Sequence, residues 1–425
     1  MQTSNPASPF TAAPVTPQLR TIVGERLPNG IVLDLVREPS GLMVIQFNGS
    51  QTVTGRTLVI DEVSYCPPIL DPTIDAAIIF PCCATEYGND ARLLRRVADV
   101  YCKHAGLPWD LAVYTAVWIL RTWVFELSPI RPTLCVRAEN MAQALPVFRI
   151  FRVLCRRALS VAELKRELPF FLQLTMLVND RKMPLRGSEF WTSANYVDTF
   201  ILGPRGTIRQ IACSRAVLLQ TYDPLEAWAE DGNAMHMQLP PGKGCVPSDA
   251  SLAALAEEFQ PQLQMFRFRH LRPALDTNSA ILQKLPDCEL TRELLPCIPD
   301  DTEVIEALAP LLQSHQQDAR DRRSREPRVA IVEVLWTPVH KPGEATATKI
   351  AKLLNALLRS RGEFRELNAH EVGRLLNRIG LVTHRGVLTF NADVRQRVHE
   401  LAAQFHLELP AVEGCPICSK SVITQ

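Results

Sequence analysis

Short β-rich runs alternate with helical segments between residues 132 and 222, and this alternation restricts the fold more than any other feature of the chain. The run PTLCV is followed by a helical pattern over 139–157, and the runs FLQLTMLV, VDTFIL, TIRQIA and AVLLQTY come after it. Strands interleaved with helices are typical of a mainly parallel sheet covered by helices. The sequence therefore predicts an α/β core.

The composition is that of a globular protein and gives no charge signal for the chain as a whole. Apolar residues make up 47% of the 425 residues and charged residues 21%, with a formal net charge of +1. This length suffices for two or three domains. Any surface that attracts nucleic acid must be local, because a net charge near zero exerts no long-range pull on phosphates.

Cysteine use and the apolar segments indicate a cytoplasmic protein without a membrane partner. The twelve cysteines are scattered, and several lie inside apolar runs, as expected of buried thiols in a reducing compartment. The most apolar helical segment, 111–127, is interrupted by Arg121 and Glu126, so we expect a buried helix and not a membrane span. The N-terminus has no basic region followed by an apolar one, as a signal peptide would.

Changes of pattern divide the chain into six segments. A Pro-, Ser- and Thr-rich tail precedes β-rich runs punctuated by turn residues, and helical periodicity begins at Asn89. Near the end, helices expected at 346–361, 369–379 and 392–406 surround a hairpin at VTHRGVLTF, which is the layout of a winged helix. We predict a disordered tail at 1–19, a small β-rich domain at 20–88, a helical entry plus α/β core at 89–250, a helical connector at 251–327, a winged helix at 328–410 and a flexible tail at 411–425.

The strand, tight loop and helix around residues 132–157 have the layout of a phosphate-binding loop without its chemistry. Such a loop follows G-x-x-x-x-G-K-[ST], whose glycines let backbone N–H groups surround phosphate while the Lys and hydroxyl contact phosphate and Mg²⁺. Those positions are taken here by Arg137, Ala142, Gln143 and Ala144. Arg137 offers an anion a positive charge at a helix N-terminus, but the neighbouring Glu139 opposes it.

Taken together, residues 20–413 resemble the ATPase and C-terminal regions of plasmid and phage primase–helicases. The segments PTLCVRAENMAQALPVFRIFRVLCRRALSV, LTMLVND, FWTSANYVDTFILGPRGTIRQIACSRAVLL and VGRLLNRIGLVTHRGVLTF are similar to that family's P-loop, Walker B strand, following strand pair and winged helix. The resemblance implies ATP hydrolysis, DNA unwinding and a hexamer, provided that the motif residues carry over. A Walker B carboxylate holds Mg²⁺, and the matching positions are Asn179 and Asp180.

Because the P-loop residues are replaced, we interpret the chain as a degenerate, non-catalytic relative of mobile-element helicases that uses no cofactor. Two alternatives stay open. One is an α/β scaffold that never bound nucleotide and docks a protein partner, and the other is a residual NTPase with a rewired site. The predicted fold class is α/β, with a P-loop-like core, a small β-rich N-terminal region and a C-terminal winged helix. The oligomeric state stays open, since losing ATP binding removes the reason for a ring.

Positive charge concentrates in the predicted winged helix. Residues 346–406 contain ten Lys or Arg and five Asp or Glu, a net charge of +5. Arg374 and Arg378 are four residues apart and share one helix face, while His384 and Arg385 fall at the hairpin turn. Phosphate contacts and a helix in the major groove are what such a module needs to bind DNA. DNA is the expected partner, with a docked protein or plain solvation of these charges as the alternatives.

Cys415 and Cys418 form a CxxC pair close to the C-terminus. A structural zinc site needs four ligands, which two such pairs commonly supply, and no second pair is present. His399 and His406 are near in sequence but lie on the preceding helix, seven residues apart, so we expect them to face different surroundings. The sequence therefore predicts no metal, with Cys415 and Cys418 as weak candidates on a mobile tail.

Overall fold

The fold was analysed in a computed structural model. It describes residues 18–128, 130–161, 172–178, 200–202, 208–210, 214–220, 234–241, 245–271, 282–363, 366–405 and 407–421. These residues form a mixed α/β structure that divides into two compact units, Met1–His315 and Gln316–Gln425. Among the described helices, none combines the length and apolarity needed to cross a membrane.

Unit 1 begins with two small sheets. The first has the antiparallel order β2-β3-β4-β5, and the second has the order β1-β7-β6, in which β1 runs parallel to β7. The bounds are β1 Gln18–Thr21, β2 Glu25–Arg26, β3 Val32–Glu38, β4 Gly41–Phe47, β5 Thr52–Gly55, β6 Leu58–Ile60 and β7 Val63–Cys66. The run TLVIDEV makes two strands because Asp61 and Glu62, with φ of 48° and 65°, form the kind of turn that reverses a hairpin.

The predicted parallel sheet is present in unit 1 and has five strands. Its order is β14-β8-β13-β10-β9, and every neighbouring pair is parallel. The strands are β8 Thr133–Ala138, β9 Ala158–Val161, β10 Thr175–Val178, β13 Ser214–Gln220 and β14 Met235–Gln238, and a separate antiparallel pair joins β11 Phe200–Leu202 to β12 Ile208–Gln210. The first strand along the chain, β8, therefore lies inside the sheet between the last two.

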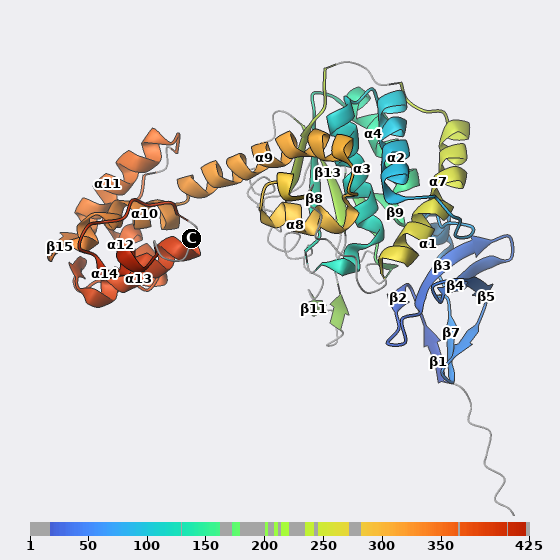
Figure 1. Cartoon of the computed structure of the whole chain (residues 1–425), viewed down its shortest axis with the longest axis horizontal. Helices are drawn as coiled ribbons and strands as arrows, with labels where there is room; N and C mark the ends of the chain where they lie inside the picture. Colours follow the sequence, from blue (N-terminus) through green and yellow to red (C-terminus); the bar gives the residue numbers. More distant parts are fainter. Residues whose placement is uncertain are drawn as a thin grey trace, which may run out of the picture. The chain divides into compact units, whose positions relative to one another are not determined.

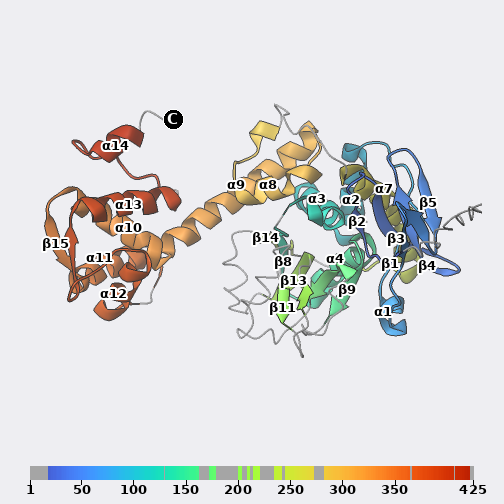
Figure 2. The same ribbon diagram turned by 90° about the horizontal axis from the view of Figure 1, so that it is seen from below.

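Helices and short 3-10 turns make up the rest of unit 1. The helices are α1 Pro72–Ala77, α2 Asp90–Ala105, α3 Trp109–Trp123, α4 Met141–Leu154, α7 Asp249–His270, α8 Glu289–Leu294 and the first part of α9 Thr302–Arg325, which continues past His315, the last residue of the unit. The 3-10 turns are Phe125–Leu127, Leu282–Lys284 and Leu295–Cys297. Figure 1 shows α2, α3 and α4 beside the strands, and Figure 2 shows the same layers from below. Leu134 and Val136 of β8 join the core formed with these helices, whereas Cys135 joins the core on the other side.

The apolar segment expected at 111–127 is a buried helix in unit 1. Helix α3 is buried along nearly its whole length, and the indole N–H of Trp118 donates to the carbonyl of Pro132 (2.9 Å). Arg121, which interrupts the apolar run, donates to the backbone carbonyls of Glu293, Val124 and Ile130. A guanidinium at 2% exposure is tolerated there because carbonyl oxygens surround it.

Unit 2 contains the helices expected from the sequence and a smaller strand pairing than expected. Its elements are α10 Pro327–Trp336, a 3-10 turn Pro338–His340, β15 Gly343–Thr346, α11 Ala347–Ser360, α12 Ala369–Arg378, β16 Val387–Phe390, α13 Ala392–Gln404 and α14 Pro416–Ser421. The hairpin predicted at VTHRGVLTF is reduced to one bridge between His384 and Val387, because β16 pairs instead with β15 in antiparallel register.

Candidate functional site

The junction between β8 and α4 holds the four positions matched to a phosphate loop, but little of it is loop. Strand β8 continues through Ala138 and helix α4 begins at Met141, so two residues connect them. Arg137 lies within the strand with an exposed side chain, paired across the backbone with Leu219 and Gln238. It has an extended backbone and not the positive φ that the first glycine of such a loop adopts.

The N-terminus of α4 is closed by side chains of the chain itself. The side chain of Asn140 caps the helix by accepting a hydrogen bond from the backbone N–H of Gln143 (3.2 Å). The side-chain Oε1 of Gln143 accepts a hydrogen bond from the backbone N–H of Glu139 (2.9 Å). Gln143 also donates to the carbonyl of Pro240 (3.4 Å) and is 6% exposed, while Ala144 is fully buried and Ala142 is exposed. These bonds occupy backbone donors that a phosphate would otherwise receive.

The proposed Walker B positions, Asn179 and Asp180, lie outside the described residues. The strand before them is described: β10 ends at Val178 and lies between β9 and β13.

Helix α12 of unit 2 displays Arg374 and Arg378 on its exposed side. Val372 and Leu376 are fully buried on the opposite face, and Asn368 with Glu371 forms a capping box at the start. The two exposed arginines line a groove of about 370 Å³ together with Glu326, Pro327, Arg328, Leu367, Glu371 and Leu375. No hydrogen bond or ion pair among the described residues engages either the Arg374 or the Arg378 guanidinium.

Several other arginines of unit 2 are already engaged. Arg359 pairs with Glu366, Arg361 pairs with Glu333 (2.6 Å), and Arg397 pairs with Glu400 (3.1 Å). Arg395 donates to the carbonyl of Val339 (3.0 Å), and Arg365 lies outside the described residues. Within the described part of the sequence window 346–406, the cations without such partners are Lys349, Lys352, Arg374, Arg378 and Arg385.

His384 and Arg385 lie at an exposed tight turn. Arg385 and Gly386 have φ of 49° and 76°, and the flanking residues His384 and Val387 exchange two backbone hydrogen bonds (2.9 and 3.0 Å). The carbonyl of Gly386 accepts the N–H of Ala347 at the start of α11 (2.7 Å), so the turn is held against that helix. Neither His384 nor Arg385 lines the groove beside Arg374 and Arg378.

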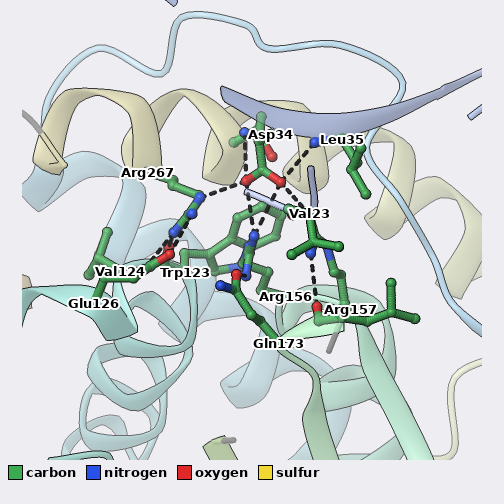
Figure 3. Close-up of polar contacts among 12 residues, drawn as sticks. Val23, Asp34, Leu35, Trp123, Val124, Glu126, Arg156, Arg157, Gln173 and Arg267 are labelled. Carbon is green, nitrogen blue, oxygen red and sulfur yellow. Dashed lines mark hydrogen bonds and ion pairs between the residues drawn. The ribbon is translucent and has the colours of Figure 1, made fainter. Parts of the chain in front are cut away.

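A buried ionic cluster in unit 1, which the sequence did not indicate, joins the N-terminal sheet to the core (Figure 3). Asp34 of β3 contacts Arg156 (3.1 Å), Arg157 and Arg267 (2.6 Å), and Arg267 also pairs with Glu126 (2.6 Å). Arg156 and Arg157 form the turn between α4 and β9, while Arg267 belongs to α7. Two separate parts of the core, the turn between α4 and β9 and helix α7, thus converge on one carboxylate.

The charge balance of this cluster favours an ionised Asp34. Burial alone raises the pKa of that carboxyl, but the Arg156, Arg157 and Arg267 guanidiniums hold the pKa well below its usual range. The pKa of Glu126 is also lowered, against its burial, chiefly by Arg267. Most polar atoms of these groups pair with one another, as a structural link between elements requires, although Nε of Arg156 is buried without a hydrogen-bond partner among the described residues. No described pocket opens onto Asp34.

Cys415 and Cys418 are packed against unit 2 and are not on a free tail. They are 4% and 5% exposed, and both belong to the unit's hydrophobic core. His399 of α13 lies beside them, with its Nε2 3.7 Å from Cys415 Sγ. His340, which was not among the candidates expected from the sequence, lies beside them too, with its Nε2 3.5 Å from Cys418 Sγ. His406 lies outside the described residues. Within the tail expected to be flexible, 411–425, the described residues 411–421 carry two thiols that are buried in the core.

No protein-family model matches this chain, and no curated protein sequence matches it either. Three solved structures show weak similarity. One is the apo A form of the NrS-1 C-terminal region, with 7% sequence identity, a TM-score of 0.35 and coverage of 84% of this chain and 97% of that chain. Another is a full-length MCM homolog from Methanopyrus kandleri, with 13% identity, a TM-score of 0.35 and coverage of 68% of this chain and 78% of that chain. The third is the active helicase Cch of SCCmec type IV, with 9% identity, a TM-score of 0.36 and coverage of 90% of this chain and 80% of that chain. Similarity this low leaves function to be argued from the geometry of the chain.

Proposed function

We propose that unit 2 is a winged-helix module that binds duplex DNA through α12, and that the core of unit 1 is the non-catalytic scaffold of a mobile-element helicase relative. The observation that carries the proposal is the pair Arg374 and Arg378, exposed on one face of α12 and without carboxylate partners among the described residues. Five other arginines of the unit, Arg328, Arg359, Arg361, Arg395 and Arg397, are held by acids or carbonyls.

The order of elements in unit 2 supports a winged helix. A helix, a strand and two further helices are followed by a tight turn and a strand that returns to pair with the first one, β15. The second helix of the α11–α12 pair then presents its outer face to solvent. Arg side chains four residues apart on such a face are neighbours and can reach phosphates or guanine edges in a major groove.

The β8–α4 junction supports a core without catalysis. The strand that would carry the nucleotide loop lies inside the sheet, where the strand order reverses and α/β proteins commonly bind ligands. This position is compatible with the P-loop ATPase core that the sequence resembles. Two connecting residues, with the helix N-terminus capped by Asn140 and Gln143, leave little backbone to surround a phosphate.

Binding of the full-length chain to a labelled DNA duplex, measured by fluorescence anisotropy, tests the proposal. We expect Arg374→Ala with Arg378→Ala to weaken binding at least about tenfold, since each lost arginine contact is worth roughly 1–3 kcal/mol. The matched control is Arg359→Ala with Arg292→Ala, which removes the same charge from two exposed arginines paired with Glu366 and Asp287. Equal affinities for the two double variants would refute a DNA-binding face on α12.

ATP turnover separates this proposal from a residual NTPase. The wild-type chain is expected to hydrolyse no ATP with Mg²⁺, in the presence or absence of DNA. Turnover that disappears in Asp180→Ala would instead establish a rewired nucleotide site. If the chain neither binds DNA nor hydrolyses ATP, the remaining alternatives for the α12 face are protein docking and plain solvation of its charges.

A further inference from the structure

Four side chains with metal-binding atoms meet inside unit 2. They are His340 from the 3-10 turn after α10, His399 from α13, and Cys415 and Cys418 at the start of α14 and within it. One ligand atom from each lies within 4.8 Å of the other three. His399 is 9% exposed and the two cysteines are more buried still, while His340 is half-buried, so three of the four groups lie in the interior of the unit.

Four of the six distances between these atoms lie close to those of a tetrahedral metal site, and all six are within 4.8 Å. The two Nε2 atoms are 3.1 Å apart, Cys418 Sγ is 3.5 Å from His340 Nε2 and 3.9 Å from His399 Nε2, and Cys415 Sγ is 3.7 Å from His399 Nε2. A tetrahedral zinc with Zn–N of about 2.0–2.1 Å and Zn–S of about 2.3 Å places neighbouring ligand atoms roughly 3.3–3.8 Å apart.

The hydrogen bonding around His340 orients it as a ligand. Its Nδ1 lies 2.6 Å from the carbonyl oxygen of Trp336, so Nδ1 carries the proton and Nε2 presents a lone pair to the cluster. Ligand histidines in metal sites commonly make this bond to a backbone carbonyl. A hydrogen bond between the histidines would satisfy those two rings alone, whereas a cation satisfies both nitrogens and both sulfurs.

The indole ring of Trp336 packs against both histidine rings and covers one side of the cluster. The Trp336 ring lies 4.5 Å from the His399 ring and 5.2 Å from the His340 ring, centroid to centroid. Its indole N–H donates to the carbonyl of Pro410 (2.9 Å), which ties the segment before the cysteines to α10. A closed site with four protein ligands is the form that structural zinc takes, since a catalytic metal needs an open position.

We propose that His340, His399, Cys415 and Cys418 bind one structural Zn²⁺ that fastens the C-terminal segment 407–421 onto α10 and α13. Two thiolates balance the charge of the ion, so the site can be buried in an apolar core without net charge. The site is independent of the DNA-binding proposal, because neither Arg374 nor Arg378 contributes to it.

Metal analysis of the purified full-length chain tests the site. We expect about one zinc per chain by elemental analysis, and four-coordinate Co²⁺ with thiolate charge-transfer bands after exchange. The double variant Cys415→Ser with Cys418→Ser should lose the metal. The control is Cys82→Ser with Cys83→Ser in unit 1, whose Sγ atoms are also close (3.6 Å) and whose replacement should leave the metal in place.

The variant His340→Cys distinguishes the loss of a metal ligand from simple misfolding. It keeps four ligands in a Cys₃His set, which also holds structural zinc, so this variant retains the metal while His340→Ala loses most of it. A wild-type chain that neither contains zinc nor takes it up when supplied would overturn the proposal. So would a disulfide between Cys415 and Cys418 in protein purified under reducing conditions.

Discussion

Arg267 of α7 donates from Nε to Oδ2 of Asp34 in β3 at 2.6 Å, with 0% and 1% of the two side chains exposed. Residues 233 positions apart are thereby joined in the interior of unit 1. The same guanidinium donates to the carbonyl of Trp123 (2.7 Å) and to both oxygens of Glu126. The small N-terminal sheet is therefore fastened to the α/β core by charge as well as by apolar packing.

Replacing Asp34 by Asn should strongly destabilise unit 1. The change leaves three guanidiniums buried around a neutral amide, and breaking a buried ion pair costs about 3–5 kcal/mol. Urea unfolding followed by tryptophan fluorescence measures the loss. The control is Asp75→Asn, whose partner Arg37 and own side chain are about one-third exposed, and which should cost less than about 1 kcal/mol. Similar losses in both variants would contradict a dominant role for the cluster.

The cluster also predicts how stability depends on pH. The pKa of Asp34 is lower in the folded chain than in the unfolded one, despite its burial, because of three guanidiniums. Its contribution is then complete above the unfolded value of about 4 and is lost as the pH falls toward the folded value. Unfolding free energies measured between pH 3 and 7 should drop below about pH 4. In Asp34→Asn the acid-side drop should be smaller, and an unchanged drop would assign it to other carboxyls.

Gly24 should tolerate no side chain. Its φ is +139°, and a Cβ there would lie 2.6 Å from Arg156 Nη2 and 3.1 Å from Asp34 Oδ1. Gly30 has a φ of +82° with nothing within 4 Å, so Gly30→Ala measures backbone strain alone. We expect Gly24→Ala to lose more unfolding free energy than Gly30→Ala, by roughly 1–3 kcal/mol. Equal losses would mean that the cluster moves aside at no cost.

The tight turn at Arg385 makes a separate prediction for DNA binding, which rests on the proposed function. A side chain that contacts a phosphate contributes about −0.9 to the slope of log affinity against log salt. Arg385→Ala should therefore flatten the slope by about one unit without changing sequence preference. Glu344→Gln on the neighbouring strand β15 is the control, since it removes a negative charge and should not flatten the slope. An unchanged slope in Arg385→Ala would exclude a phosphate contact by the turn.

Local signals in the sequence gave most of the helices. Asn89, Asn368 and Asn391 each cap the helix that follows, and asparagine is among the residues that favour this position. The parallel pairing of the core strands followed from their alternation with helices. These features depend on neighbours within a few residues, so a single sequence contains what determines them.

Long-range convergence was not predictable in the same way. Asp34 reads as a polar interruption in a β-rich run, and its partners are 122 to 233 residues away. His340 is 59 residues before His399, and His399 is 16 residues before Cys415. Neither of these two spacings matches a familiar zinc-ligand pattern. The one available signal was the CxxC pair, which calls for two more ligands wherever the fold supplies them. Only packing decides which histidines arrive there.

The short connection between β8 and α4 limits how nucleotide binding could be engineered into this chain. Writing Gly, Gly, Lys and Thr into positions 137, 142, 143 and 144 would restore the residues of a phosphate loop, but Glu139 and Asn140 would still be the whole span between strand and helix. Backbone N–H groups from several consecutive residues have to curve around a phosphate. A gain of nucleotide affinity would therefore require lengthening the chain at this junction, and substitutions alone should fail.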